Sequence, residues 1–178
     1  MSAPPSALLL VDGYNIIGTW PQLKVSRDTH GLEVARRELI ESLINYSAHK
    51  GYKTQVVFDA QYQNTPSNQE DYTETLSAYF TAFGQTADTY IEKLCAALRA
   101  STQRTIVATS DQTQRHMIVG YGAFWLSALQ LYKEVELTAR LRQRQQRGNN
   151  KRSSGRYLMH SLDATAKQRL EQWRQGIY

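Results

Sequence analysis

The chain contains almost no cysteine and no long hydrophobic run. Its 178 residues include one cysteine, Cys95, so an internal disulfide and a cysteine-based zinc cluster are both excluded. The apolar run at residues 7–11 is far too short for a membrane helix, and the residues before it lack the basic character that begins a signal peptide. We therefore expect a cytoplasmic protein, or one of the plastid stroma if the source is a plant.

Several catalytic motifs are also absent. The four histidines show neither a His-x-His nor a His-x₃-His spacing, so we expect no zinc or haem site. Gly120-x-Gly122 is not a dinucleotide-binding fingerprint, because Trp125 stands where the third glycine would be. The chain has no phosphate-binding P-loop and no Gly-x-Ser-x-Gly motif. The sequence therefore argues against enzymes that depend on these motifs.

Hydrophobic patterning predicts a domain in which strands and helices alternate. Hydrophobic residues make up 41% and charged residues 21%, which are ordinary values for a globular protein, and a chain of this length suits one domain with a small extension. Strands are predicted at residues 7–11, 54–58, 76–83, 105–109 and 124–126, and helices at residues 31–50, 87–98, 111–118, 127–146 and 161–174. Residues 61–71 are predicted as a polar loop and residues 148–155 as a break. The alternation predicts an α/β fold, with a parallel sheet flanked by helices on both faces.

Four aspartates each follow a predicted strand or begin a predicted helix. They are Asp12, Asp59, Asp88 and Asp111. Because the carboxyl ends of parallel strands meet at one edge of a sheet, we expect these side chains in one crevice. Carboxylates crowded together repel one another and lose hydration, so they stay ionised only if a cation neutralises them. Oxygen ligands suit Mg²⁺ or Mn²⁺, and the sequence therefore predicts a site for one of these metals.

A metal site of this kind suits the hydrolysis of phosphodiesters. A divalent ion can activate a water molecule and neutralise charge on the phosphate, so no separate general base is required. Glu92 lies one helical turn after Asp88 and could face the same cleft. The residues also have purely structural alternatives. Asp88 and Asp111 could serve only as helix caps. Asp12 and Asp59 could serve only in turns, and Glu92 could be a solvated helix residue.

The positive charge of the chain is concentrated in one segment. Seven basic residues and no acid lie in it: Arg140, Arg142, Arg144, Arg147, Lys151, Arg152 and Arg156. Without them, 14 basic residues face 16 acidic ones, so a formal net charge of +5 becomes −2. This segment, called the basic arm below, is typical of a phosphate-binding element, and we expect it to bind RNA. The alternative is a solvated helix end with a linker.

An aromatic residue beside the first aspartate is a further candidate for RNA contact. Tyr14 follows Asp12 by two positions and could stack on a base near the site. The alternative for Tyr14 is that its ring packs under the first loop.

Five short motifs occur in an order that resembles a known family. They are Val11-Asp-Gly-Tyr-Asn-Ile-Ile17, Phe58-Asp-Ala60, Thr86-Ala-Asp-Thr-Tyr-Ile-Glu92, Thr109-Ser-Asp111 and Gly122-Ala123. Across residues 8–136 the chain resembles the YacP-type branch of the NYN domains, which are PIN-like nucleases of bacteria, cyanobacteria and plastids. The resemblance implies a Rossmann-like PIN fold and divalent-metal-dependent ribonuclease activity. In characterised bacterial members the activity is cleavage of messenger RNA on translating ribosomes.

The resemblance also implies roles for individual residues. The family's metal-binding acids fall on Asp12, Asp88 and Asp111, with Asp59 and Glu92 as further members and Asn15 as a supporting polar residue. Two positions depart from the family pattern: Gln85 stands where Glu is frequent, and Gln112-Thr-Gln114 stands where Glu-Gln is frequent. Neither departure removes a core carboxylate, so both bear on fine geometry and rate.

The sequence thus predicts a nuclease domain at residues 1–147 and, at residues 148–178, a basic linker with a C-terminal helix. The predicted function is a divalent-metal-dependent endoribonuclease, with messenger RNA on the ribosome as the expected substrate. One alternative is a non-catalytic RNA- or ribosome-binding protein of the same fold, which the retention of all the acids disfavours. Another is a phosphatase of small molecules, which the basic arm disfavours.

Overall fold

The computed structural model describes residues 5–60 and 65–161, with side chains up to residue 148. The chain divides into two units, Met1–Thr138 and Ala139–Tyr178. The last helix runs from the first unit into the second, so the domain boundary expected at residue 147 stays a prediction. No helix in the described part of the chain is both long and apolar enough to cross a membrane.

The first unit is built on one six-stranded sheet with the strand order β3-β4-β2-β1-β5-β6. The strands are β1 (Ala7–Asp12), β2 (Tyr52–Phe58), β3 (Asn68–Asp71), β4 (Leu76–Phe80), β5 (Thr105–Ala108) and β6 (Phe124–Leu126). All neighbouring pairs are parallel except β3 and β4, which are antiparallel. β1 lies at the centre, and its apolar run is buried because helices cover both faces of the sheet.

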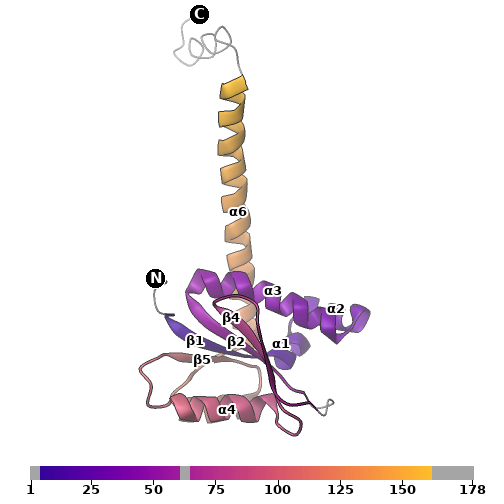
Figure 1. Cartoon of the computed structure of the whole chain (residues 1–178), viewed down its shortest axis with the longest axis vertical. Coiled ribbons are helices and arrows are strands. Elements are labelled where there is room, and N and C mark those ends of the chain that lie inside the picture. Colours follow the sequence, from indigo (N-terminus) through magenta and orange to yellow (C-terminus); the bar gives the residue numbers. More distant parts are fainter. Residues whose placement is uncertain (1–4, 61–64, 162–178) are drawn as a thin grey trace, which may run out of the picture. The chain divides into compact units, whose positions relative to one another are not determined.

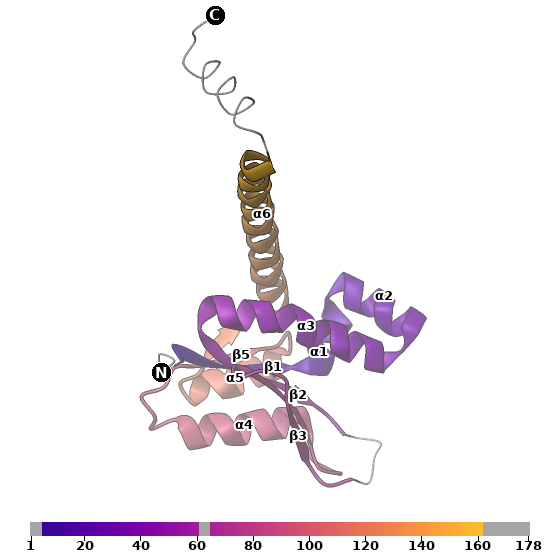
Figure 2. The ribbon, with the colours of Figure 1, turned by 45° about the horizontal axis from the view of Figure 1, so that its top comes forward.

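Within the first unit the helices, with the start of α6, form two layers, as Figures 1 and 2 show. They are α1 (Gly13–Thr19), α2 (Pro21–His30), α3 (Leu32–Lys50), α4 (Ala87–Leu98), α5 (Gln112–Gly120) and α6 (Ala128–Ser161). Successive residues of β1 point to opposite faces of the sheet. Leu9 packs in the core formed with α1, α3 and the start of α6, and Leu10 packs in the core formed with α4 and α5. The predicted α/β architecture with helices on both faces is confirmed.

Within the first unit the structure differs from the predicted elements in three places. Residues 13–30 form α1 and α2, which were not predicted because each is too short to show a clear helical period. Residues 68–71, predicted as loop, form β3; its burial pattern is fully exposed, so it lacks the alternation that marks a strand. The predicted strand at residues 76–83 ends at Phe80.

The predicted break at residues 148–155 is wrong, because α6 continues to Ser161. A single glycine inside a helix costs only about 1 kcal/mol, and Gly148 follows a run of Arg, Leu and Gln residues that favour helix. The helix predicted at residues 161–174 lies outside the described residues after Ser161.

A tight contact fixes where α1 begins. Gly13 is the first residue of α1, and a Cβ atom added to it would lie 2.3 Å from Cε1 of Phe58. Phe58, the last residue of β2, is fully buried and packs against Tyr14 and Phe80, with ring centroids 5.2 and 5.4 Å away. α1 can therefore start directly at the end of β1 only because position 13 has no side chain.

This contact generates a stability prediction with a matched control. Gly13→Ala should lower the free energy of unfolding by about 1–3 kcal/mol, because the new methyl group overpacks a closed aromatic cluster. Gly18→Ala lies in the same helix with nothing within 4 Å of the added Cβ, and it should leave stability unchanged or raise it by about 0.5–1 kcal/mol. Urea unfolding followed by circular dichroism measures both. Equal stability of the two variants would contradict the packing argument.

Candidate functional site

The carboxyl ends of the three central strands carry three of the predicted aspartates. Asp12 ends β1 and pairs with Val57 of β2, so Asp59 lies two residues beyond it on one side. Val11 pairs with Ala108 of β5, so Asp111 lies two residues beyond Asp12 on the other side. The parallel register therefore brings these three acids to one edge of the sheet, as the sequence predicted.

Helix capping orients two of these carboxylates. Asp12 caps α1 by accepting a bond from the backbone N–H of Asn15, at 3.3 Å, and Asp111 caps α5 by accepting from the N–H groups of Thr113 and Gln114, at 2.7 and 3.1 Å. Asp111 is therefore a helix cap, as the structural alternative suggested, but the cap does not show that this is its only role. Each cap uses only Oδ1, so capping and binding of a further ligand are compatible.

Asp88 comes from the other layer of the fold. It lies in the first turn of α4, whose cap is Thr86, the acceptor of a 3.1 Å bond from the N–H of Thr89. A negative charge in this first turn is favoured by the helix dipole. Asp88 is therefore not the cap of its helix, and its carboxylate is available to the site.

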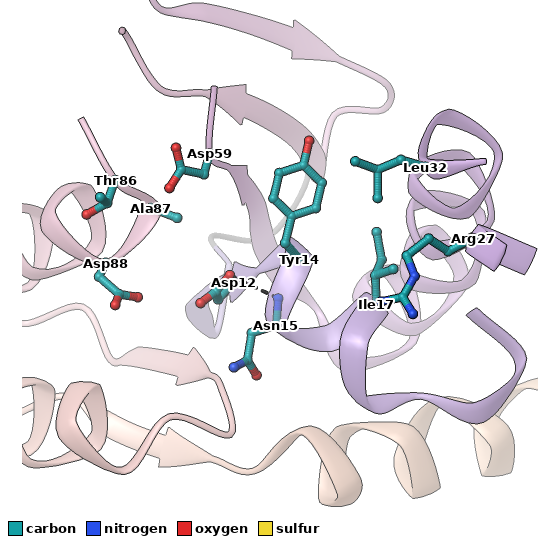
Figure 3. Close-up of a pocket in the computed structure, with 10 residues that line it drawn as sticks. All are labelled: Asp12, Tyr14, Asn15, Ile17, Arg27, Leu32, Asp59, Thr86, Ala87 and Asp88. Atoms are coloured by element: carbon teal, nitrogen blue, oxygen red, sulfur yellow. Dashed lines mark hydrogen bonds between the residues drawn. The ribbon is translucent and has the colours of Figure 1, made fainter. Parts of the chain in front are cut away.

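These residues surround a cavity of about 500 Å³ (Figure 3). Its walls are Asp12, Tyr14, Asn15, Ile17, Arg27, Leu32, Asp59, Thr86, Ala87 and Asp88. Figure 3 shows the carboxylates of Asp12, Asp59 and Asp88 on one side and Leu32 with Arg27 on the other. Two of the acidic residues predicted for the metal site, Asp111 and Glu92, do not line this cavity.

Asp111 is nevertheless electrostatically part of the site, because its charge acts on two of the other acids. The pKa of Asp12 is raised from 3.8 to about 6 in total: burial is the largest cause, the N–H of Asn15 opposes it, and the charges of Asp88, Asp111 and Asp59 add to it. The pKa of Asp88 is also raised, first by burial and then by Asp111 and Asp59. Glu92 does not appear among these influences; its charge acts instead on the Cys95 thiol of the same helix.

The carboxylates of the site are chemically suited to a divalent cation, but their positions do not form a ready set of metal ligands. Carboxylate oxygens are the ligands of Mg²⁺ and Mn²⁺. The pKa values of Asp12 and Asp88 are raised first by burial and then by neighbouring carboxylates, and a bound cation would offset both effects. Within residues 5–60 and 65–148, however, no three acidic, histidine or cysteine side chains lie close enough together to hold a metal ion as they stand. Binding of a metal by Asp12, Asp88 and Asp111 therefore stays a prediction.

Asn15 has a specific structural task. Its side-chain Oδ1 accepts a 2.7 Å bond from the backbone N–H of Ser110, the residue before Asp111. This bond joins the loop after β5 to the first turn of α1, and so fixes Asp111 relative to Asp12. The supporting role predicted for Asn15 corresponds to this cross-link.

Tyr14 is packed and also lines the cavity. Its ring lies 5.2 Å from that of Phe58, and its hydroxyl accepts a 3.1 Å bond from Nη1 of Arg36. The alternative that Tyr14 packs under the first loop is therefore realised, while the half-buried ring still faces the cavity in Figure 3. Its stacking on a base stays a prediction.

Sequence reasoning missed three residues near the site. Arg27 lines the cavity, and Arg36 holds the Tyr14 hydroxyl. Gln114 is 2% exposed, and within the described part of the chain neither atom of its side-chain amide has a hydrogen-bond partner. A buried amide of this kind is costly, and such groups gather at functional sites. No local motif marks Arg27 or Arg36, whereas Gln114 lies in the Gln112-Thr-Gln114 stretch that the family comparison singled out without giving it a role.

The described bases of the arm are exposed. Arg140, Arg142, Arg144 and Arg147 lie on α6 in the second unit, and all four are solvent-exposed. Lys151, Arg152 and Arg156 also fall within α6, but their side chains lie outside the described residues. RNA binding by the arm stays a prediction.

Comparison with known proteins decides the family. The model of the YacP-like NYN domain matches residues 9–175. The chain belongs to this family. The uncharacterized protein YacP of Bacillus subtilis (strain 168) is 36% identical over 170 residues, which cover 95% of this chain and 97% of the relative. The family resemblance inferred from the five motifs is confirmed, and it makes this a PIN-like, nuclease-type domain.

Solved structures of this YacP-like NYN family support the same assignment. The crystal structure of Rae1 (YacP) from Bacillus subtilis has a TM-score of 0.68 at 35% identity and covers 95% of each chain. A crystal structure of a mutant of the same Bacillus subtilis protein has a TM-score of 0.67 at 39% identity and covers 80% of this chain and 82% of the other. The predicted PIN-like fold is therefore confirmed by neighbours of the same family.

The buried Asp12 generates a pH-dependent stability prediction. Asp12 binds its proton more tightly when folded, with a pKa of about 6 against 3.8, so its contribution makes stability fall as pH rises from about 4 to about 6. Asp12→Asn removes the charge and retains a capping oxygen. In EDTA at pH 8 the variant should be more stable than wild type by about 1–3 kcal/mol, and the gap should close below pH 4.

The control is an exposed aspartate with the opposite shift. The pKa of Asp28 is lowered by its hydrogen bond with Arg27, so Asp28→Asn should give no gain at pH 8. Urea unfolding across pH measures both variants. A pH-independent difference between Asp12→Asn and wild type would contradict the buried-charge argument.

Proposed function

We propose that this protein is a divalent-metal-dependent endoribonuclease. The observation that carries the proposal is the acidic cavity: Asp12, Asp59 and Asp88 line one space, and Asp111 acts electrostatically on two of them. Such mutual repulsion is tolerated where a cation is bound during function. Membership of a nuclease-type family supports the same chemistry.

The residues of the chain would divide the work as follows. Asp12, Asp88 and Asp111 hold Mg²⁺ or Mn²⁺, and Asp59 assists from the neighbouring strand end. When bound, the metal supplies an activated water and neutralises charge on the phosphate. Asn15 keeps the Asp111 loop against α1, so the two capped carboxylates stay at a fixed separation. The exposed bases of α6 suit RNA phosphates, which favours RNA over a small phosphate ester.

One observation favours a second candidate, a non-catalytic RNA- or ribosome-binding protein. In the part of the chain with described side chains, the acids do not converge into a ready metal cluster. The two candidate functions predict different effects when the aspartates are replaced. A nuclease loses activity without them, whereas a pure binder keeps or gains affinity when negative charge near the RNA is removed.

The first test is cleavage. Asp12→Asn, Asp88→Asn and Asp111→Asn should each lower the cleavage rate by on the order of 100-fold or more, the loss typical when one group that stabilises transition-state charge is removed. RNA cleavage with Mg²⁺ or Mn²⁺, with and without ribosomes, measures this. Asp71→Asn, a substitution of the same type at an exposed position of β3 outside the cavity, should cut at the wild-type rate.

Metal binding is measured on the same variants. Mg²⁺ or Mn²⁺ should raise the melting temperature of wild type, because a ligand of the folded state alone stabilises it, and the rise should be smaller for Asp88→Asn. Cleavage at the wild-type rate by all three variants would overturn the assignment of these aspartates as catalytic. No cleavage by wild type, together with no metal-dependent shift, would leave the non-catalytic RNA binder as the function.

The proposed substrate is RNA, with messenger RNA on the translating ribosome as the physiological form. The basic arm would bind its phosphates. Changing Arg144, Arg147, Lys151 and Arg152 to Gln should weaken RNA or ribosome binding and flatten the slope of log affinity against log salt by about two to three units, since each phosphate contact to a single strand accounts for roughly 0.7. Cleavage of a short, saturating RNA should survive.

The matched control removes the same charge from the other unit. Four exposed bases of the first unit serve this purpose: Lys53, Lys93, Arg99 and Lys133. Their replacement by Gln should change the salt slope less than the arm variant does. Equal slopes for the two quadruple variants would show that the arm is a solvated helix end.

A further inference from the structure

The acidic cavity continues into a groove on one side. A second cavity of about 750 Å³ shares Tyr14, Leu32 and Asp59 with the first. A third, of about 270 Å³, shares Arg36, Glu70 and Phe80 with the second. Adjacent cavities with common walls make one groove, called here the α3 groove, which leads from the aspartates past Tyr14 along the start of α3. In Figure 3, Tyr14 stands at the junction, between Asp59 and Leu32.

The α3 groove contains a cation, Arg36, that forms no ion pair among the described side chains, although Glu33 and Glu70 line the same part of the groove. Arg36 is half-buried; Nη1 donates to the Tyr14 hydroxyl at 3.1 Å, and its guanidinium lies 5.7 Å from the centre of the Phe80 ring. Among the described side chains, no carboxylate lies within the 4.0 Å of an ion pair with Arg36; the ion pairs found are Arg27–Asp28 and Lys50–Glu134. The nearby Glu70 accepts a 2.7 Å bond from the Tyr72 hydroxyl instead.

These contacts fix the guanidinium without using up its donors. One N–H bonds the Tyr14 hydroxyl, and a planar guanidinium has several more in a fork that matches phosphate oxygens. The Phe80 ring limits rotation of the side chain, so little conformational entropy is lost when a ligand binds. An arginine held by aromatic groups and lacking an acidic partner is suited to an external anion.

We propose that the α3 groove binds single-stranded RNA beside the cleavage position, with Arg36 holding a phosphate next to the scissile one. This inference rests on the proposed nuclease function of the acidic cavity. Tyr14 spans the two positions: it follows Asp12 by two residues, and its hydroxyl contacts Arg36. The side chain of Tyr14 thus links the acidic cavity to the phosphate position that we assign to Arg36. Aromatic walls beside a phosphate-binding cation are the features by which proteins hold single strands.

The first measurement is binding in EDTA, where cleavage cannot interfere. A short fluorescein-labelled oligouridylate is titrated with the full chain and followed by anisotropy. Arg36→Gln should weaken binding about tenfold, as expected for one charged hydrogen-bonded contact, and should flatten the salt slope by roughly 0.7. A blunt RNA duplex should bind without dependence on Arg36. An unchanged affinity and slope for Arg36→Gln, or an equal loss with duplex, would overturn the proposal.

Two variants separate phosphate binding from a packing role. Arg104 lies 4.4 Å from the Phe124 ring at the other side of the sheet, so Arg104→Gln removes the same charge and the same kind of contact away from the groove, and its binding should match wild type. Tyr14→Phe removes the hydroxyl and keeps the ring. If Arg36 only positioned Tyr14, Tyr14→Phe would reproduce the loss seen in Arg36→Gln; we expect a smaller one.

The catalytic test is read separately. With Mn²⁺, Arg36→Gln should raise KM about tenfold and leave kcat within about twofold of wild type, because the metal site is untouched. If the protein binds oligouridylate through Arg36 but never cleaves RNA, the nuclease proposal is wrong and RNA binding by the α3 groove is supported. If the protein cleaves RNA with the same KM after Arg36→Gln, RNA binding by the groove is wrong and the nuclease proposal is supported.

Discussion

The mutual repulsion of the carboxylates at one edge of the sheet is the constraint on which the site depends. Asp12 is almost fully buried, and its pKa is raised to about 6 by burial and by three neighbouring acids. Such a group would move apart from the others if the backbone allowed it. It cannot, because its Oδ1 caps α1, and the Asn15 side chain ties α1 to the loop that carries Asp111. The unfavourable charge is held in place by hydrogen bonds and by the core beneath it.

That core also explains why the site is rigid. β1 is buried from both faces, with Leu9 and Val11 in one cluster and Leu10 in the other. Burying an aliphatic side chain is worth roughly 1.5–3 kcal/mol, so a few such residues under the edge offset the penalty of the desolvated aspartate. The close approach of Gly13 to Phe58 then places α1, and with it Tyr14, directly against the end of β2.

The acids were predictable from sequence because they are tied to strand ends. A short apolar run followed by Asp12, or Val-Val-Phe followed by Asp59, is a local pattern, and parallel pairing brings such ends together whatever lies between. Asp88 and Asp111 were placed by helix starts for the same reason. Arg36 and Gln114 had no such signal. Their environments arise from segments far apart in the chain, such as Phe80 against Arg36, and no local pattern encodes them. α1 and α2 were too short, and β3 too exposed, for periodicity to show them.

The arginines near the site complete the electrostatic argument. A cation in contact with Asp12 would lower its pKa and occupy the place of a metal, yet every charge that acts on Asp12 is another carboxylate. Arg27 lines the same cavity, but its Nε donates to Asp28 at 2.8 Å. Arg36 is directed to the Tyr14 hydroxyl and the Phe80 ring. No cation is thus among the charges that act on Asp12, which leaves its negative charge for an external cation, and the guanidinium of Arg36 keeps donors for an external anion. A metal ion bound together with an RNA phosphate meets both demands at once.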